Sequence, residues 1–199
     1  MNYVYIHGFN SGAGSRSGAL LEAMLGQPVL RVVNDYSQDY KTCLAATEAQ
    51  ISAQFPSPAQ LCVMGTSLGG FYALQLRLPG IARVAAWNPV VFPALQLAAF
   101  VGENTRFTDG KKWHFSRQAL LSYAAAADAR QWSNFQLAAR YGDSQPPPCP
   151  LRHVYIGSHD EVLDHEIGVS FWHGHAGLTV IDSGHSIADF SHAAPFLIP

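Results

Sequence analysis

Residues 61–70 read LCVMGTSLGG, and this stretch decides the fold class. The apolar run at 61–64 is typical of a short strand that is buried on both faces. It passes directly into the turn GTSLG at 65–69, and the helix-like residues 71–78 then end before Pro79. The stretch therefore predicts a strand, a tight turn and a helix, in that order.

The turn has the pattern Gly-x-Ser-x-Gly, with Ser67 at its centre. A serine hydroxyl is a poor nucleophile until it is exposed and a base removes its proton. A sharp strand-to-helix turn exposes the hydroxyl, and the flanking glycines let the backbone close without Cβ clashes. The pattern arises by chance in roughly one chain in fifteen of this length, so the strand before it and the helix after it carry the argument. We predict that Ser67 is the nucleophile of an α/β-hydrolase fold.

Short apolar runs alternate with longer segments of helical period along most of the chain. This alternation predicts a mostly parallel sheet of about six strands, flanked by helices. The clearest helical pattern lies at 38–55, where apolar residues recur every three or four positions until Pro56. The six strands are expected at Tyr3–Ile6, Val29–Val33, Leu61–Met64, Val84–Trp87, Val154–Ile156 and Leu178–Ile181.

The stretch from about Pro93 to Pro150 interrupts this alternation. It contains two helix-like pieces, Ala94–Phe100 and Phe115–Ala129, and no run that predicts a strand. Its length is far more than one crossover between neighbouring strands needs. We therefore expect a small helical cap, inserted over one end of the sheet in a single domain of residues 1–199.

Two further catalytic candidates follow the last two predicted strands, in the chain order Ser, Asp, His that this fold uses. Asp160 comes just after the strand at 154–156, and His185 comes just after the final strand, behind a glycine. Since the carboxyl ends of parallel strands meet at one edge of a sheet, both are expected near Ser67. Ser67 would attack a carbonyl, His185 would take and return the proton, and Asp160 would orient the imidazole and stabilise its charged form.

The acid of this triad has competitors. Glu161 and Asp164 lie in the same loop and could replace Asp160. Asp164 is also well placed to begin the following helix, because carboxylates favour helix N-termini. Histidines in nearby loops lack the strand and the glycine turn that precede His185.

The oxyanion hole is expected to use the backbone N–H groups of two residues. In this fold one donor is the residue after the nucleophile, here Leu68, and the other comes from the loop after the first strand. That loop reads HGFN at 7–10, and we expect Phe9 to supply the second N–H. The alternative is that Gly8 and Gly12 merely turn the chain.

A second motif points to another class of enzyme. Gly12, Gly14 and Gly18 imitate a dinucleotide-binding fingerprint. Asp35 follows Gly14 by 21 residues, as the ribose-binding acid of such a site would. An NAD(P)-dependent oxidoreductase is therefore one alternative, and a catalytically silent α/β-hydrolase scaffold is another. The fingerprint should begin at the end of the strand, whereas Gly12 comes only after an intervening loop, and the motif leaves Ser67 unexplained.

Composition narrows the possible partners. The 199 residues include 12 Lys and Arg against 14 Asp and Glu, a formal net charge of −2, so no nucleic-acid partner is expected. No apolar run approaches the roughly 20 residues that span a bilayer, and the N-terminal MNYVYIHG lacks the pattern of a secretory signal.

The residues around His173 and His175 match no spaced ligand set, so no metal is expected. We expect a cytoplasmic protein that acts on a small molecule without a membrane partner; its oligomeric state stays open.

Five short motifs follow one another along nearly the full chain: YIHGFNS at 5–11, GTSLGG at 65–70, WNPV at 87–90, DEVLD at 160–164 and GH at 184–185. Together they resemble the YqiA-type small bacterial esterases of the α/β-hydrolase superfamily. The resemblance implies hydrolysis of carboxylic esters, or of acyl thioesters such as those of CoA, without a cofactor. It also implies Ser67, Asp160 and His185 as the triad, in agreement with the residues placed above.

Overall fold

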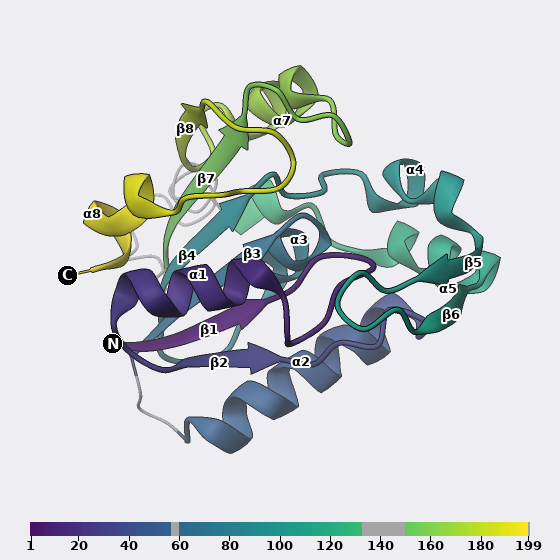
Figure 1. Ribbon diagram of the computed structural model, residues 1–199, viewed down its shortest axis with the longest axis horizontal. Helices are drawn as coiled ribbons and strands as arrows, with labels where there is room; N and C mark the ends of the chain where they lie inside the picture. The colour runs from purple at the N-terminus through teal and green to yellow at the C-terminus, as the bar shows by residue number, and fades with distance from the viewer. Residues whose placement is uncertain (57–59, 133–149, 199) are drawn as a thin grey trace.

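Six strands form the central sheet of the computed structural model, which describes residues 1–56, 60–132 and 150–198 (Figure 1). They are β1 (Asn2–Ile6), β2 (Val29–Val32), β3 (Leu61–Thr66), β4 (Ile81–Trp87), β7 (Leu151–Gly157) and β8 (Gly177–Ile181). Their order is β2-β1-β3-β4-β7-β8, and every neighbouring pair is parallel. The predicted parallel sheet of about six strands is confirmed, with each strand within three residues of its expected bounds.

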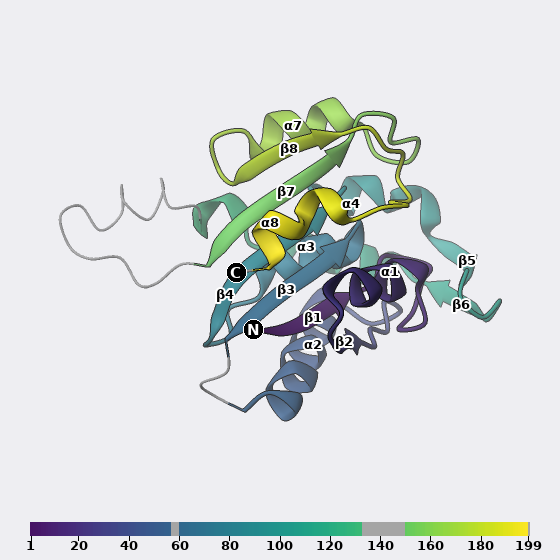
Figure 2. The ribbon, with the colours of Figure 1, turned by 60° about the vertical axis from the view of Figure 1, so that its left-hand side comes forward.

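Helices cover both faces of this sheet (Figure 2). α1 (Arg16–Leu25) and α8 (Ala194–Leu197) pack on one face, and α2 (Tyr40–Gln54), α3 (Leu68–Gln75) and α7 (His165–Trp172) pack on the other. β1 shows the alternation that this requires, because Val4 and Ile6 belong to the core with α2, α3 and α7. Tyr3 and Tyr5 belong to the core with α1. All four are at most 3% exposed, as residues of a strand between two helix layers should be.

Capping side chains determine where the helices begin. Asp39 precedes α2, and its Oδ1 accepts the N–H groups of Lys41 and Thr42, both at 3.0 Å. Ser15 precedes α1, and its Oγ accepts the N–H of Gly18 at 3.3 Å. The helix predicted at 38–55 therefore starts two residues later, at Tyr40.

The segment between β4 and β7 differs from the expected helical cap. It contains the short helices α4 (Pro93–Gln96) and α5 (Arg117–Ser122), but between them lies an antiparallel hairpin of β5 (Gly102–Thr105) and β6 (Lys112–Phe115). The expectation of no strand here is wrong, and the helix expected from Phe115 begins at Arg117. Three 3-10 turns complete the described part, at Ala98–Phe100, Tyr123–Ala125 and Ala129–Trp132. Residues 133–149 of the expected cap lie outside the described residues.

The apolar pattern of the sequence does not predict the hairpin, because its strands carry few apolar side chains. In β5 only Asn104 is buried, and in β6 only Phe115 is buried, so neither strand shows an apolar run. The turn signal was nevertheless present, because Asp109-Gly110 lies between the strands and Gly110 has a φ of 69°. An Asp-Gly pair is a strong hairpin indication when extended residues flank it.

This hairpin lies at the carboxyl edge of the sheet and holds the loop that follows β1 (Figure 1). The N–H of Phe107 donates to the carbonyl of Asn10 at 2.7 Å. The Asn10 side chain accepts from Trp113 Nε1 at 2.8 Å and donates to Asn104 Oδ1 at 3.2 Å. Three hydrogen bonds therefore tie the loop after β1 to the inserted hairpin.

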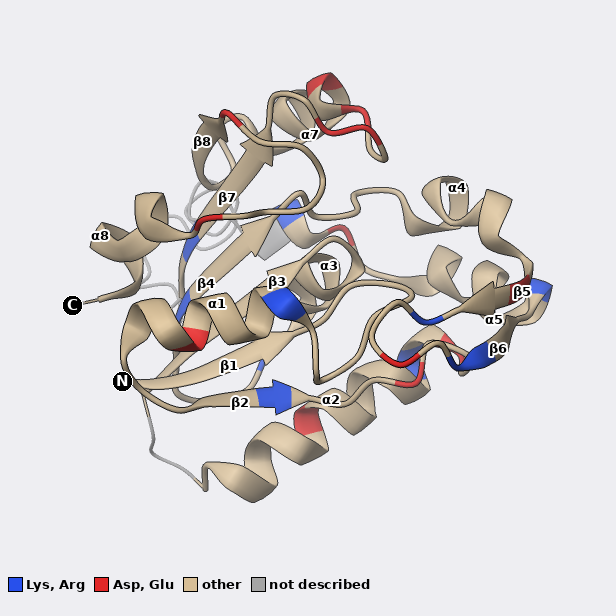
Figure 3. Cartoon of the chain, viewed as in Figure 1, with Lys and Arg blue, Asp and Glu red and all other residues tan. Residues whose placement is uncertain are grey.

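Charged side chains of both signs are spread over the elements (Figure 3). Acidic residues gather around α7 and the loop before it, whereas Lys and Arg occur singly on several elements or mixed with acidic residues near β5 and β6. The described residues thus present no continuous basic face in this view. None of the described helices combines the length and apolar character needed to cross a bilayer.

Candidate active site

Ser67 occupies the turn between β3 and α3, where the sequence predicts it. Its φ of 53° and ψ of −124° lie in a region that side-chain-bearing residues rarely adopt, at a cost of roughly 1–3 kcal/mol. The surrounding backbone holds this conformation: the Ser67 N–H donates to the carbonyl of Trp87 at 2.9 Å. The Ser67 carbonyl accepts the N–H groups of Phe71 at 3.1 Å and Val90 at 3.2 Å. The strained turn is therefore fixed to both β4 and α3.

Two glycines of the motif are required by close backbone approach. A Cβ on Gly65 would lie 2.3 Å from the carbonyl oxygen of Gly69. A Cβ on Gly69 would lie 2.1 Å from the carbonyl oxygen of Ile6, in β1. No side chain fits at these distances, so the glycines let α3 start directly against the ends of β3 and β1.

The loop after β1 runs alongside Ser67. A Cβ on Gly8 would lie 3.2 Å from the Cβ of Ser67 and 3.8 Å from its Oγ. Leu68 is the first residue of α3, so its N–H has no acceptor within the helix. The structure thus places both predicted oxyanion donors, Phe9 and Leu68, in segments that adjoin Ser67.

A buried histidine supports this loop. His7 is 1% exposed, and burial lowers the pKa of its imidazole, which favours the neutral ring. Its Nε2 accepts the N–H of Asn34 at 3.2 Å, so Nδ1 carries the proton that it donates to the Gly8 carbonyl at 2.9 Å. The Tyr36 hydroxyl donates to the His7 carbonyl at 2.5 Å. Three hydrogen bonds between neutral groups therefore hold His7 and the start of this loop.

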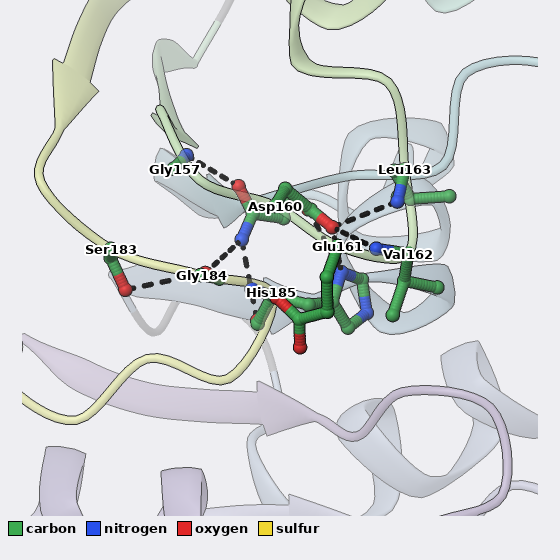
Figure 4. Close-up of polar contacts among 9 residues, drawn as sticks. Gly157, Asp160, Glu161, Val162, Leu163, Ser183, Gly184 and His185 are labelled. Atoms are coloured by element: carbon green, nitrogen blue, oxygen red, sulfur yellow. Dashed lines mark hydrogen bonds and ion pairs between the residues drawn. The ribbon is translucent and has the colours of Figure 1, made fainter.

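Asp160 and His185 contact each other directly (Figure 4). His185 Nδ1 lies 3.0 Å from Asp160 Oδ1 and 2.9 Å from Oδ2. The Asp160 side chain is 2% exposed and that of His185 is 18% exposed. Asp160 Oδ1 also accepts the N–H groups of Val162 and Leu163, each at 2.8 Å. The acid is thus held from two sides, by its own loop and by the imidazole.

This environment sets the protonation of the pair. Burial raises the pKa of Asp160, but the hydrogen bonds from His185 and from the Leu163 and Val162 N–H groups outweigh burial and leave the pKa below its ordinary value. An ionised carboxylate only accepts hydrogen bonds, so His185 Nδ1 carries the proton between them. The second imidazole nitrogen, Nε2, is then unprotonated in the neutral ring and can accept a proton.

The competing carboxylates have other partners. Glu161 Oε2 accepts the backbone N–H of His185 at 2.9 Å, so it holds the histidine loop rather than the ring. Asp164 precedes α7, where its Oδ1 accepts the N–H groups of Glu166 at 2.9 Å and Ile167 at 3.4 Å. Asp164 therefore caps the helix, one of the two roles that the sequence leaves open for it.

Asn88 is a polar residue of this region to which sequence reasoning assigned no role. It is 3% exposed, follows β4 directly and has a φ of 44°, a conformation that Asn tolerates better than most residues. Its Oδ1 accepts the N–H of Gly157 at 2.7 Å, and its Nδ2 donates to the carbonyls of Gly184 at 3.0 Å and His185 at 3.3 Å. One amide thus joins the start of the Asp160 loop to the His185 loop. The sequence feature that could have indicated this role is a polar residue at the carboxyl end of a strand, followed by Pro89.

Ser67 and His185 line the same cavity, of about 570 Å³, which we call the catalytic cavity. Among the described residues, no hydrogen bond joins Ser67 Oγ to the imidazole. The structure therefore brings Asp160 and His185 into contact and places Ser67 on the wall of the cavity that His185 also lines. The wall of the cavity includes apolar residues, namely Phe9, Val90, Leu97, Phe100 and Phe107. It also includes polar residues, namely Asn10, Ser11, Ser15, Arg16 and Ser17.

The glycine loop that imitates a dinucleotide fingerprint forms part of this same wall. Gly14 lines the catalytic cavity. β1 ends at Ile6 and α1 begins only at Arg16, so the strand, the glycines and the helix do not follow one another as the fingerprint requires. Within residues 1–56, 60–132 and 150–198, no group of three or more His, Cys, Asp or Glu side chains could hold a metal ion.

A model of the Uncharacterised protein family UPF0227 matches residues 2–198. The chain belongs to this family. The match confirms the YqiA-type resemblance that the five motifs indicate.

Solved structures show which fold this family member has. Est1E from Butyrivibrio proteoclasticus is similar with a TM-score of 0.62 at 13% identity, over 92% of this chain and 78% of that chain. The esterase domain of a Rhodothermus marinus protein is similar with a TM-score of 0.59 at 16% identity, over 98% of this chain and 82% of that chain. Polyneuridine aldehyde esterase is similar with a TM-score of 0.55 at 11% identity, over 93% of this chain and 92% of that chain. The chain therefore has the predicted α/β-hydrolase fold.

Proposed function

We propose that this protein is a serine hydrolase that cleaves carboxylic esters through an acyl-serine intermediate, with Ser67, His185 and Asp160 as its triad. The observation that carries the proposal is the paired Asp160 and His185 beside a cavity whose wall includes a serine in a strained strand-to-helix turn. Such an arrangement matches the roles of nucleophile, base and orienting acid.

The reaction proceeds in two halves. Ser67 Oγ attacks the ester carbonyl carbon while His185 Nε2 takes the hydroxyl proton, and the oxyanion that forms accepts the N–H groups of Phe9 and Leu68. Collapse of this intermediate breaks the bond to the leaving oxygen, which takes the proton from His185. Water then attacks the acyl-serine, gives a proton to His185 and releases the carboxylic acid, and the proton returns to Ser67. A thioester would follow the same course with a thiol as the leaving group.

The described thiols are poor alternatives to Ser67 as the nucleophile. Cys43 and Cys62 are both buried and neither lines the catalytic cavity. Burial raises the pKa of Cys43 to about 11 and that of Cys62 to about 12, so both stay protonated at neutral pH.

The walls of the catalytic cavity support a small-molecule substrate with an apolar acyl group and a more polar leaving group. Phe9, Phe100 and Phe107 offer aromatic contact to an acyl group. Ser17 and Arg16, which also line the cavity, offer hydroxyl and guanidinium groups to a polar leaving group. Two of the structural neighbours, the Rhodothermus marinus domain and polyneuridine aldehyde esterase, are named as esterases, which fits this substrate class.

Turnover of p-nitrophenyl butyrate, followed by acid quench and peptide mass spectrometry, tests the proposal. We expect release of p-nitrophenolate and a butyryl group on the peptide that contains Ser67, because deacylation of an activated ester passes through the acyl-serine. Absence of turnover by the folded protein would contradict the proposal. Tight binding of NAD(P) in that case would support the oxidoreductase, and no binding would support a silent scaffold.

The substitution Asn88→Ala is expected to lower kcat by about 10²-fold with little change in KM, because small misplacements of catalytic groups have effects of this size. The downfield proton resonance of His185 Nδ1, assigned by its loss in His185→Ala, should broaden or disappear. Gln75→Ala is the matched control, since it removes another buried amide whose Nε2 donates to the Ala127 carbonyl at 2.7 Å. Unchanged kcat and an unchanged resonance in folded Asn88→Ala would show that Asn88 does not position the triad.

A further inference from the structure

A second cavity, of about 270 Å³, shares a single lining residue with the catalytic cavity. That residue is Val90. We call this second space the apolar cavity, because aliphatic and aromatic side chains form most of its wall, among them Phe71, Val91, Phe92, Tyr123, Phe171 and Trp172. Asp128 also lines it, but its carboxylate is paired with the guanidinium of Arg130 at 2.6 Å. The cavity therefore suits a hydrocarbon ligand.

The apolar cavity begins close to the nucleophile. Val90 is 2% exposed, and its N–H donates to the carbonyl of Ser67 at 3.2 Å. Phe71 donates to the same carbonyl at 3.1 Å and lies one helical turn, about 5.4 Å, along α3 from Ser67. The backbone of Val90 is thus fixed next to that of Ser67, and Val90 belongs to the walls of both the catalytic cavity and the apolar cavity.

We propose that Val90 is a specificity-determining residue that confines the acyl group of the substrate to the catalytic cavity. Its isopropyl group separates an acyl chain on Ser67 from the apolar cavity, which would otherwise accept further methylene groups. The inference rests on the proposed ester hydrolysis and names the part of the substrate that Val90 selects. Each methylene moved from water into an apolar site is favoured about fourfold, which corresponds to about 0.8 kcal/mol.

The chain-length profile of Val90→Ala tests this inference, with p-nitrophenyl butyrate, octanoate and dodecanoate as substrates. The ratio of kcat/KM for dodecanoate to that for butyrate should rise by about 10-fold or more over the unmodified protein, since several methylenes gain an apolar site. Val91→Ala is the matched control, because Val91 is also buried but lines only the apolar cavity. In Val91→Ala the ratio of kcat/KM for dodecanoate to that for butyrate should stay within about twofold of the ratio in the unmodified protein.

Two further variants keep the inference testable if Val90→Ala folds poorly or loosens the core. Val90→Cys is a milder truncation and should shift the ratio in the same direction. Ala126 lines the apolar cavity, so Ala126→Leu added to Val90→Ala should fill the opened space and restore the original ratio. An unchanged ratio in Val90→Ala and Val90→Cys, or an equal rise in Val91→Ala, would overturn the role of Val90 while ester hydrolysis stands. Absence of Ser67-dependent hydrolysis in the unmodified protein would overturn both proposals.

Discussion

Replacing Ser67 with alanine is expected to lower kcat for p-nitrophenyl butyrate by about 10⁶-fold, the size of effect seen when a serine hydrolase loses its nucleophile. The variant lacks the oxygen that forms the acyl bond, and His185 cannot compensate for that loss. The fold should persist, because alanine keeps the Cβ and the backbone bonds from Ser67 to Trp87, Phe71 and Val90. Steady-state kinetics and thermal unfolding of both proteins measure the two parts of this expectation.

Ser186 provides the matched control. It follows His185 directly and lines the same catalytic cavity as Ser67, but it lies outside the strand-to-helix turn. Ser186→Ala should therefore change kcat by less than about tenfold. Retention of more than about one hundredth of the activity in Ser67→Ala would show that another group attacks the ester, since nucleophile loss has a far larger effect.

The substitution Asp160→Asn is expected to lower kcat by up to about 10⁴-fold while the protein stays folded. Asparagine offers an N–H₂ group to His185 Nδ1 and so favours the wrong tautomer, in which Nε2 carries the proton and cannot accept one. Its remaining carbonyl oxygen can still accept the N–H groups of Val162 and Leu163, which preserves the loop. Kinetics and far-UV circular dichroism check the two outcomes.

Asp164→Asn is the control for this substitution. Asparagine caps helices about as well as aspartate, so α7 should stay intact and kcat should change little. If Asp164→Asn rather than Asp160→Asn removed activity, the acid of the triad would be wrongly assigned.

The ionised form of Asp160 also links the site to stability. Because hydrogen bonds hold the pKa of Asp160 below its ordinary value, the folded protein favours the carboxylate more than the unfolded chain does. The resulting stabilisation is present above the ordinary pKa, near 4, and is lost as pH falls through the lower pKa of the folded state. The acid therefore supports the fold at the pH where the proposed reaction would run.

The inner strands of the sheet could be predicted from the sequence because they are largely buried on both faces. β1 and β3 each have one residue that is not buried, and such strands are near-continuous apolar runs. The edge strand β8 has no buried residue, but its sequence GLTVI still contains three apolar side chains. The candidate site could be predicted for a related reason. Parallel strands end at one edge, so Ser67 and the loops after β7 and β8, which contain Asp160 and His185, had to lie at that edge.

The hairpin β5–β6 and the role of Asn88 could not be predicted in the same way. The hairpin buries one side chain on each strand and draws its stability from contacts with the loop after β1, including Phe9 against Trp113 with ring centroids 4.9 Å apart. Asn88 bonds to Gly157 and Gly184, which lie 69 and 96 residues away along the chain. Local patterns of hydrophobicity carry no record of contacts at that separation.

Labelling with a fluorophosphonate probe, followed by peptide mapping, tests the central claim most directly, because the probe reacts with a serine whose proton a neighbouring base removes. The folded protein should take up one probe molecule per chain, on Ser67, and His185→Ala should lose this labelling. Folded protein that leaves Ser67 unlabelled, or that labels it equally well without His185, would contradict the proposal that this turn presents an activated nucleophile.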